Sequence, residues 1–289
     1  MSDGLLAGES GFRTGRGLAF VLGAFRGGTT LLRKVLDTHP AVCSPAETWF
    51  MLPLVNLWEG AGEHGRFNPK QAAAAIRHHL KQEEFVACCR AFAGRFYAQA
   101  MLNHGAGRSA SVFVDKTPFY LQIAGALPTL FPEARFIVLG RDPRGILWSR
   151  HTWRHGGEDP IESRMKGVAT DFGRLAGFWA ARERFGADRV HLVRYEDLCA
   201  SPADEARKLC GFLGVGFDAG MVDYGHASHH EGYGDEKSRE HARPHTGSVD
   251  RWRGGMSEAV QAEVARACGG EALGALGYGE LAGLGTAAA

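Results

Sequence analysis

The chain has 289 residues, of which 45% are hydrophobic, and a formal net charge of +1. This length and composition can bury a substantial core, and we expect a single domain over residues 1–289. The near-neutral charge gives no basic field for a nucleic-acid backbone, so any bound anion must be held by local arginines. The polar start has no secretory pattern and no apolar run is long enough for a membrane span, so we expect a cytoplasmic protein.

Short apolar runs alternate with segments of helical periodicity along the chain. Continuous apolar runs are typical of strands buried on both faces of a parallel sheet. The alternation therefore predicts an α/β fold with three layers, in which helices flank a central parallel sheet. The expected strands are residues 17–23, 111–114, 134–140 and 189–194, and the expected helices are residues 69–104, 145–154, 166–186, 203–213 and 257–268.

Two segments do not fit a simple alternation of strands and helices. Residues 50–107 are too long for a connection and are rich in alanine and aromatic residues, so we expect a helical excursion that covers one side of the site. Residues 226–248 contain five of the 13 histidines among glycines and charged residues. Their spacing matches no compact set of metal ligands, and we expect a mobile polar loop without a metal; a metal site is the alternative.

The first expected strand leads into a glycine-rich loop, since residues 23–30 read GAFRGGTT. Gly23, Gly28 and Thr30 occupy the places of the glycines and the Ser/Thr in a P-loop, but Thr29 replaces its lysine. That lysine binds the outer phosphates of a triphosphate, whereas loop amides and a helix N-terminus cradle one anionic group. The loop predicts a P-loop-type fold with a phosphate ligand other than ATP or GTP. The alternative is a tight turn that binds nothing.

The strand at residues 134–140 is followed by Arg141, Asp142 and Pro143. A triphosphatase would place a magnesium-binding aspartate at the end of such a strand. Arginine instead suits a phosphate, and Ser149 on the following helix adds a hydroxyl donor, so we expect a second phosphate site. The alternative is a surface ion pair between Arg141 and Asp142, with Pro143 at the first position of a helix.

These motifs resemble those of sulfotransferases that use 3′-phosphoadenosine 5′-phosphosulfate (PAPS). Residues 26–31 resemble the family's 5′-phosphosulfate loop, and residues 141–149 resemble its 3′-phosphate motif. PAPS and its product, 3′,5′-adenosine bisphosphate, have no third phosphate for a loop lysine to bind. Further similar stretches follow in the family's order at residues 194–198, 201–202, 213–214, 251–253, 256–257 and 276–278.

The resemblance implies which residues contact the donor. Within the family, the chain is most similar to the branch of bacterial and protein-tyrosine sulfotransferases. Many relatives have proline and serine where Phe25 and Gly27 stand, so one hydroxyl donor is missing and the loop should be more flexible. The implied contacts are Arg26, Gly27, Gly28, Thr29 and Thr30 at the 5′-phosphate, Arg141 and Ser149 at the 3′-phosphate, Tyr195 at the nucleotide, and Thr246, Gly247, Ser248 and Arg251 over the 3′-phosphate and adenine.

The resemblance also implies catalytic roles for three residues. Glu47 lies 21 positions after Arg26, the spacing expected of that branch's general base, which takes the proton of the attacking hydroxyl. Lys116 and Arg26 would stabilise charge on the phosphate oxygen that sulfur leaves. The alternatives are that Glu47 is a carboxylate at the start of a helix near Trp49, and that Lys116 pairs with Asp115 on a solvated surface.

Taken together, the resemblance implies an enzyme that transfers a sulfuryl group in line from PAPS to a hydroxyl acceptor, without a metal. The acceptor would be a phenol or tyrosine, a sugar or another alcohol, carried by a small molecule, a glycan or a peptide. The alternatives are a P-loop phosphotransferase and a catalytically silent nucleotide-binding protein. No motif in the sequence indicates the acceptor or the oligomeric state.

Overall fold

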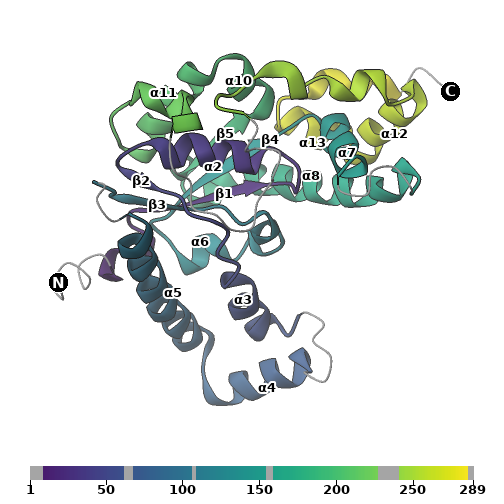
Figure 1. The fold of residues 1–289 in the computed structure, drawn as a ribbon. Coiled ribbons are helices and arrows are strands. Elements are labelled where there is room, and N and C mark those ends of the chain that lie inside the picture. Colours follow the sequence, from purple (N-terminus) through teal and green to yellow (C-terminus); the bar gives the residue numbers. More distant parts are fainter. Residues whose placement is uncertain (1–8, 62–67, 106–108, 154–158, 227–240, 286–289) are drawn as a thin grey trace.

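The apolar runs form a five-stranded sheet in which every neighbouring pair is parallel (Figure 1). The computed structural model describes residues 9–61, 68–105, 109–153, 159–226 and 241–285. The strands lie in the order β2-β3-β1-β4-β5. Their bounds are β1 (Leu18–Gly23), β2 (Val42–Cys43), β3 (Val112–Asp115), β4 (Arg135–Gly140) and β5 (Val190–Arg194).

Each face of the sheet has its own core, because successive residues of a strand point to opposite faces. In β1, Phe20 and Leu22 pack on one side with residues of three helices, α5 (Gln82–His104), α8 (Met165–Ala180) and α12 (Glu258–Cys268). Ala19 and Val21 pack on the other side with residues of α2 (Thr29–Thr38) and α11 (Pro202–Leu213). The predicted three-layer α/β fold is confirmed. The helices are α2 (Thr29–Thr38), α3 (Met51–Glu59), α4 (Pro69–His79), α5 (Gln82–His104), α6 (Leu127–Leu130), α7 (Pro143–His151), α8 (Met165–Ala180), α9 (Arg182–Phe185), α10 (Tyr195–Ala200), α11 (Pro202–Leu213), α12 (Glu258–Cys268) and α13 (Gly270–Ala275).

The four expected strands are confirmed to within one residue at each end, but β2 was not expected. The expected helix over residues 69–104 is two helices. Leu80 and Lys81 between them have extended backbone, and the Lys81 amide donates to Glu84 Oε2 (2.8 Å) at the start of α5. The expected helix over residues 166–186 likewise divides into α8 and α9.

Helices α3, α4 and α5 extend from the sheet as a lobe, which lies at the bottom of Figure 1. They fall within residues 50–107, where we expected a helical excursion. Helix α3 has the sequence MLPLVNLWE, yet only Met51 and Val55 in it are buried. None of the described helices combines the length and the apolar composition that a bilayer crossing requires.

Candidate active site

The carboxyl ends of the strands bring together residues that are distant in sequence. The glycine loop follows β1, Glu47 lies four positions after β2, and Lys116, Arg141 and Tyr195 directly follow β3, β4 and β5. Because these strands are parallel, their carboxyl ends lie at one edge of the sheet, where ligands bind in open α/β folds. These polar residues are therefore at one edge of the sheet.

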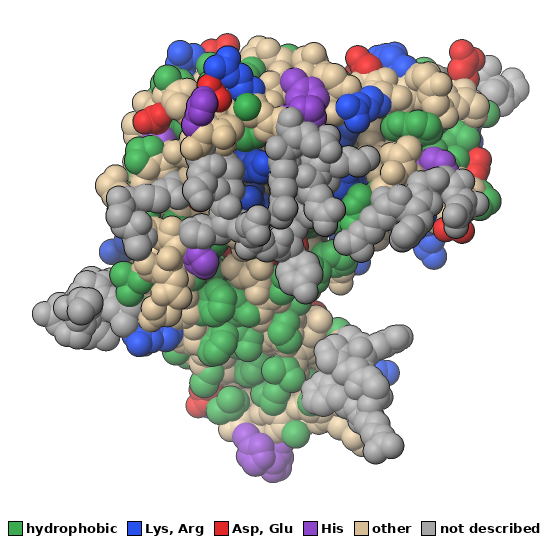
Figure 2. All heavy atoms as spheres, viewed as in Figure 1, with side chains coloured by type: hydrophobic (Ala, Val, Ile, Leu, Met, Phe, Trp, Pro, Cys, Tyr) green, Lys and Arg blue, Asp and Glu red, His purple; other side chains and the backbone are tan. Residues whose placement is uncertain are grey.

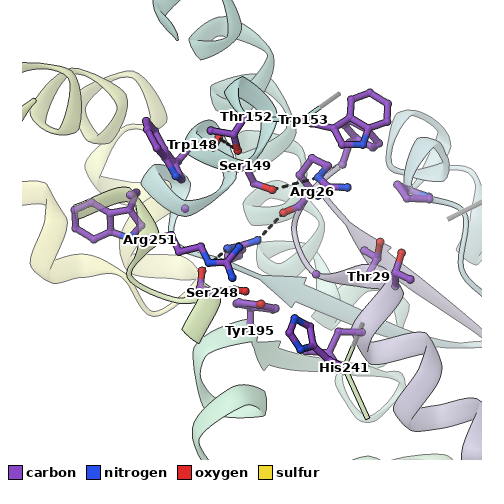
Figure 3. Close-up of a pocket in the computed structure, with 18 of the residues that line it drawn as sticks. Arg26, Thr29, Trp148, Ser149, Thr152, Trp153, Tyr195, His241, Ser248 and Arg251 are labelled. Atoms are coloured by element: carbon purple, nitrogen blue, oxygen red, sulfur yellow. Dashed lines mark hydrogen bonds between the residues drawn. The ribbon is translucent and has the colours of Figure 1, made fainter. Parts of the chain in front are cut away.

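A cavity of about 730 Å³ lies at this edge (Figure 3). Its volume is within the usual range for small-molecule sites. Lys116 is buried next to Glu47, Gly27 is buried within the loop, and Thr246 and Gly247 are exposed just before Ser248. The expected residues that do line the cavity are Arg26, Gly28, Thr29, Thr30, Glu47, Arg141, Ser149, Tyr195, Ser248 and Arg251.

The glycine loop presents the N-terminus of α2 to this cavity. Helix α2 begins at Thr29, directly after Gly28, and no side chain caps it. Its first amides are therefore available to an anion. Gly28 has a φ of 96°, and a Cβ atom there would lie 2.2 Å from the Tyr195 ring. This position requires glycine both for its backbone conformation and for its close contact with Tyr195.

Two arginines that follow β4 hold the carbonyl groups of the loop. Arg141 Nη1 donates to the Arg26 carbonyl (2.9 Å), and Arg150 Nε donates to the Phe25 carbonyl (3.1 Å). Arg26 itself has a φ of 65°, a left-handed conformation that is unfavourable for a residue with a Cβ atom. The surrounding hydrogen bonds hold this conformation in place.

Arg141 is largely buried, and its Nε atom has no hydrogen-bond partner among the described residues. Nη2 donates to the Ser248 carbonyl (3.0 Å), and the guanidinium lies 4.2 Å from the centre of the Tyr195 ring. A buried donor without a partner is unfavourable, so this atom fits an anionic ligand. Ser149 lies nearby and accepts a hydrogen bond from Arg26 Nε (3.2 Å; Figure 3).

The alternative of a surface ion pair between Arg141 and Asp142 is wrong. Asp142 instead pairs with Arg144, with 2.7 Å between Oδ2 and Nη2, and both side chains are largely buried. Pro143 does begin α7, and Asp142 caps it by accepting from the Arg144 amide (2.8 Å).

Glu47 and Lys116 form a buried ion pair, with 2.6 Å between Oε1 and Nζ. The Lys116 side chain is 0% exposed and that of Glu47 10%, so a solvated surface pair between Lys116 and Asp115 is wrong. Glu47 does not start a helix either, because α3 begins at Met51 and has no acidic residue in its first turn. Burial lowers the pKa of Lys116, and the negative charge of Glu47 opposes that effect.

A buried hydrogen-bond network ties the residue after Glu47 to the residue before Lys116. Asp115 accepts from Thr48 Oγ1 (2.6 Å), Tyr97 (2.8 Å) and Thr117 (3.0 Å). Since the Thr48 hydroxyl donates to Asp115, it accepts from Tyr120, with 2.7 Å between the two oxygens. Burial raises the pKa of Asp115 to about 6, although the three donors oppose this shift.

The segment that carries Glu47 is also anchored at its other end, at Ser44. The Ser44 amide donates to Asp37 (3.0 Å), its carbonyl accepts from Arg33 (2.8 Å), and its hydroxyl donates to the Val114 carbonyl (2.9 Å). Glu47 therefore lies between two fixed points, one on α2 and β3 and the other on the Asp115 network.

Sequence reasoning missed the aromatic residues that line one side of the cavity. Phe25, Trp49, Phe119 and Trp153, here called the aromatic wall, all line it. Ring centres are 4.9 Å apart for Phe25 and Trp153, 6.3 Å for Phe25 and Phe119, and 4.8 Å for Trp49 and Phe119. The only available signal was proximity in sequence, because Trp49 follows Glu47 by two positions.

Most of the histidine-rich segment, residues 227–240, lies outside the described residues. His241 and His245 line the cavity, with ring centres 4.1 Å apart. Burial and repulsion from His241 and Arg251 lower the pKa of His245. In the part of the chain that the structure describes, no three His, Cys, Asp or Glu residues are grouped as a metal site would require.

The fold is that of a P-loop-like α/β protein, and the cavity presents an uncapped helix N-terminus and a buried arginine. Residues 19–219 match the family model described as "Sulfotransferase family". The chain belongs to the sulfotransferase family.

Similar proteins include the nodulation protein NoeE of Sinorhizobium fredii, which is 28% identical over 90% of this chain and 66% of its own length. Protein-tyrosine sulfotransferase 1 of Danio rerio is 26% identical over 74% of this chain and 56% of its length. The chain thus spans between half and two thirds of these curated relatives. The sulfotransferase domain of the Synechococcus PCC 7002 olefin synthase has the same fold, with a TM-score of 0.57, 23% identity, and coverage of 87% of this chain and 92% of that domain.

We predict that Gly28→Ala lowers the free energy of unfolding by about 1–3 kcal/mol, because it strains the backbone and contacts the Tyr195 ring. The matched control is Gly173→Ala in α8, where a Cβ atom meets nothing within 4 Å. The control should raise stability by about 0.5–1 kcal/mol, since alanine favours a helix interior. Denaturant titration measures both, and equal effects would contradict the explanation.

Asp115 should make stability depend on pH. Its pKa is about 6 in the folded protein and about 3.9 in an unfolded chain. The folded state therefore binds this proton more tightly, and Asp115 contributes stability that is complete below about pH 4 and is lost as the pH rises through about 6. Relative to Asp115→Asn, the wild type should lose about 2–3 kcal/mol between about pH 4 and pH 7. Denaturant titrations of both proteins test this, and a constant difference would disprove it.

Proposed function

We propose that the protein transfers a sulfuryl group from PAPS to the hydroxyl of an acceptor, with Glu47 as the general base. The observation that carries the proposal is the position of the ion pair between Glu47 and Lys116. It lies at the same edge of the sheet as the uncapped N-terminus of α2 and the buried Arg141 guanidinium. One anion site next to a carboxylate and a second anion site nearby fit a donor with a 5′-phosphosulfate and a 3′-phosphate.

Residues of the loop and of α7 would hold the donor. Residues 26–30 would bind the 5′-phosphate with amides at the start of α2. Arg141, through its unpartnered Nε, and Ser149 would bind the 3′-phosphate. Tyr195 would contact the nucleotide, and residues 246–248 with Arg251 would close over it. Thr29 favours this donor over a triphosphate, because it supplies no ammonium group for a third phosphate.

The transfer itself needs a proton acceptor and a counter-charge. When bound, PAPS supplies the sulfuryl group: the acceptor oxygen forms a bond to sulfur while the bond from sulfur to the 5′-phosphate oxygen breaks. Glu47 takes the proton of the attacking hydroxyl. Arg26 and Lys116 stabilise the negative charge that develops on the phosphate oxygen. The products are a sulfate ester and 3′,5′-adenosine bisphosphate.

The ion pair suggests how proton transfer to Glu47 is linked to the stabilisation of the leaving phosphate by Lys116. Lys116 is buried, so its ammonium group needs a negative partner throughout the reaction. Protonation of Glu47 removes that partner at the moment when the leaving phosphate gains negative charge. Lys116 would then exchange one counter-charge for the other, which favours the transition state over the ground state. In this way the protein's own cations would promote the transfer.

The relatives indicate the breadth of acceptors to be tested. Several are named as protein-tyrosine sulfotransferases, and carbohydrate sulfotransferase 1 of Danio rerio is 33% identical over 32% of this chain. For this chain we propose only that the acceptor carries a hydroxyl group.

The donor assignment predicts binding of 3′,5′-adenosine bisphosphate in calorimetry. Arg141→Gln should weaken that binding about ten- to a hundredfold, because it removes a charged hydrogen-bond donor. Arg207→Gln, at an exposed position of α11, is the control and should bind normally. Binding of ATP with magnesium but not of the bisphosphate would overturn the proposal.

The base assignment predicts that Glu47→Gln lowers turnover about 10²- to 10⁴-fold. Turnover is measured with sulfur-labelled PAPS and panels of phenols, tyrosine peptides and sugars. Affinity for 3′,5′-adenosine bisphosphate should not fall, because Lys116 keeps its charge, and this separates the loss of the base from a loss of donor binding. Glu83→Gln, an exposed change in α5, is the control. Normal turnover by the Glu47 variant would remove this residue from the mechanism.

A further inference from the structure

We propose that the acceptor is an uncharged amphiphilic alcohol, whose hydroxyl-bearing head reaches Glu47 and whose hydrocarbon part lies on an apolar surface along α3. This inference rests on the proposed function and specifies its acceptor. Three features of the described residues carry it: the charges of the cavity, the composition of α3, and the exposed aromatic side chains beside the cavity.

The cavity has no charged side chain to spare for the acceptor. Among the described residues that line it, the Lys, Arg, Asp and Glu side chains are Arg26, Glu47, Arg141 and Arg251. Each already serves the donor or the proton transfer in the proposed function. The side next to Glu47 is the aromatic wall, whose flat rings bind apolar faces. A charged head group there would lose water without gaining a partner, which is unfavourable.

The apolar character continues out of the cavity along the chain itself. Helix α3 begins four positions after Glu47, and its one charged residue is Glu59 at the end. A helix that is apolar on all sides is normally buried. Here Leu52, Leu54, Leu57 and Trp58 are only half-buried and Pro53 is exposed.

Aromatic side chains from other elements extend this surface. Phe119 of the aromatic wall is 39% exposed, and Phe92 of α5 is 53% exposed. Phe50, directly after Trp49, packs on Phe92 and Phe96 with ring centres 5.7 and 4.0 Å apart. Figure 2 shows hydrophobic side chains over much of the visible face of the lobe that α3, α4 and α5 form.

The apolar surface along α3 is continuous with the site around Glu47, and this continuity identifies the acceptor as what covers the surface. Exposed apolar patches of this kind mark binding sites. Because the reacting hydroxyl must lie at Glu47, a part of the acceptor that extends past Trp49 and Phe119 meets α3 and Phe92. Among the described residues along this surface, a cation appears at the far end, where Arg77 lies 5.3 Å from the Trp58 ring centre. A hydrocarbon chain matches this surface, whereas an acidic peptide would find no positive partner among the described residues of α3.

The test is calorimetric binding of n-alkyl β-D-glucosides with methyl, butyl, hexyl and octyl chains. It uses the wild-type protein saturated with 3′,5′-adenosine bisphosphate and ligand below the micelle-forming concentration. We expect affinity to rise about two- to fourfold for each added methylene. Phe92→Ser should abolish most of this rise while leaving binding of the bisphosphate unchanged. Phe217→Ser is the matched control, because Phe217 is 38% exposed and follows α11, outside the lobe of α3, α4 and α5.

Several results would overturn the inference. Affinity that is independent of chain length, or an equal effect of the two serine variants, would show that the surface does not bind the chain. Tighter binding of a glutamate-rich tyrosine peptide than of octyl glucoside would indicate an acidic peptide acceptor. Binding to phosphatidylcholine vesicles without affinity for the glucosides would indicate a membrane surface. Failure of the bisphosphate to bind refutes the proposed function, whereas normal bisphosphate binding with any of these results refutes only the amphiphilic acceptor.

Discussion

A buried ammonium group must have a negative partner, and this requirement organises the edge of the sheet around Lys116. Its side chain is fully buried, and Glu47 is the carboxylate that compensates it. The two residues follow different strands, β2 and β3, and are 69 positions apart. The ion pair therefore fixes how the segment after β2 lies against the end of β3. In the proposed function, a carboxylate held in this way is already in position before the acceptor hydroxyl binds.

The polar network behind the pair explains how a short segment without regular secondary structure can hold Glu47, the proposed base, in place. Segment 44–51 is neither helix nor strand over most of its length, but hydrogen bonds fix Ser44 and Thr48 on either side of Glu47. Asp115 is the centre of this network and accepts three hydrogen bonds. Buried networks of this kind are rigid when every member is satisfied. Rigidity around Glu47 would lower the reorganisation that proton transfer requires.

Sequence patterns predicted what depends on local periodicity and missed what depends on packing. The strands and the glycine loop follow from apolar runs and glycine spacing, so they were found to within one residue. Strand β2 has only two residues and no periodic signal, so it was missed. The location of Glu47, Lys116 and Arg141 at one edge follows from the rule for parallel strands. The Asp115 network and the aromatic wall could not be predicted, because their members come from separate segments that only the fold brings together.

Phe25 and Gly27 depart from the family's loop pattern, and each departure has its own structural consequence. A Cβ atom on Gly27 would lie 2.8 Å from the Ala24 carbonyl oxygen, so a serine there would require the loop to shift. Gly27 therefore allows a tight turn at this point, and Arg141 and Arg150 hold the carbonyl groups of the loop. Phe25, in place of the family's proline, contributes a ring to the aromatic wall. The loop that would bind the donor thus also shapes the acceptor side, so changes in this loop are expected to alter both the donor affinity and the choice of acceptor.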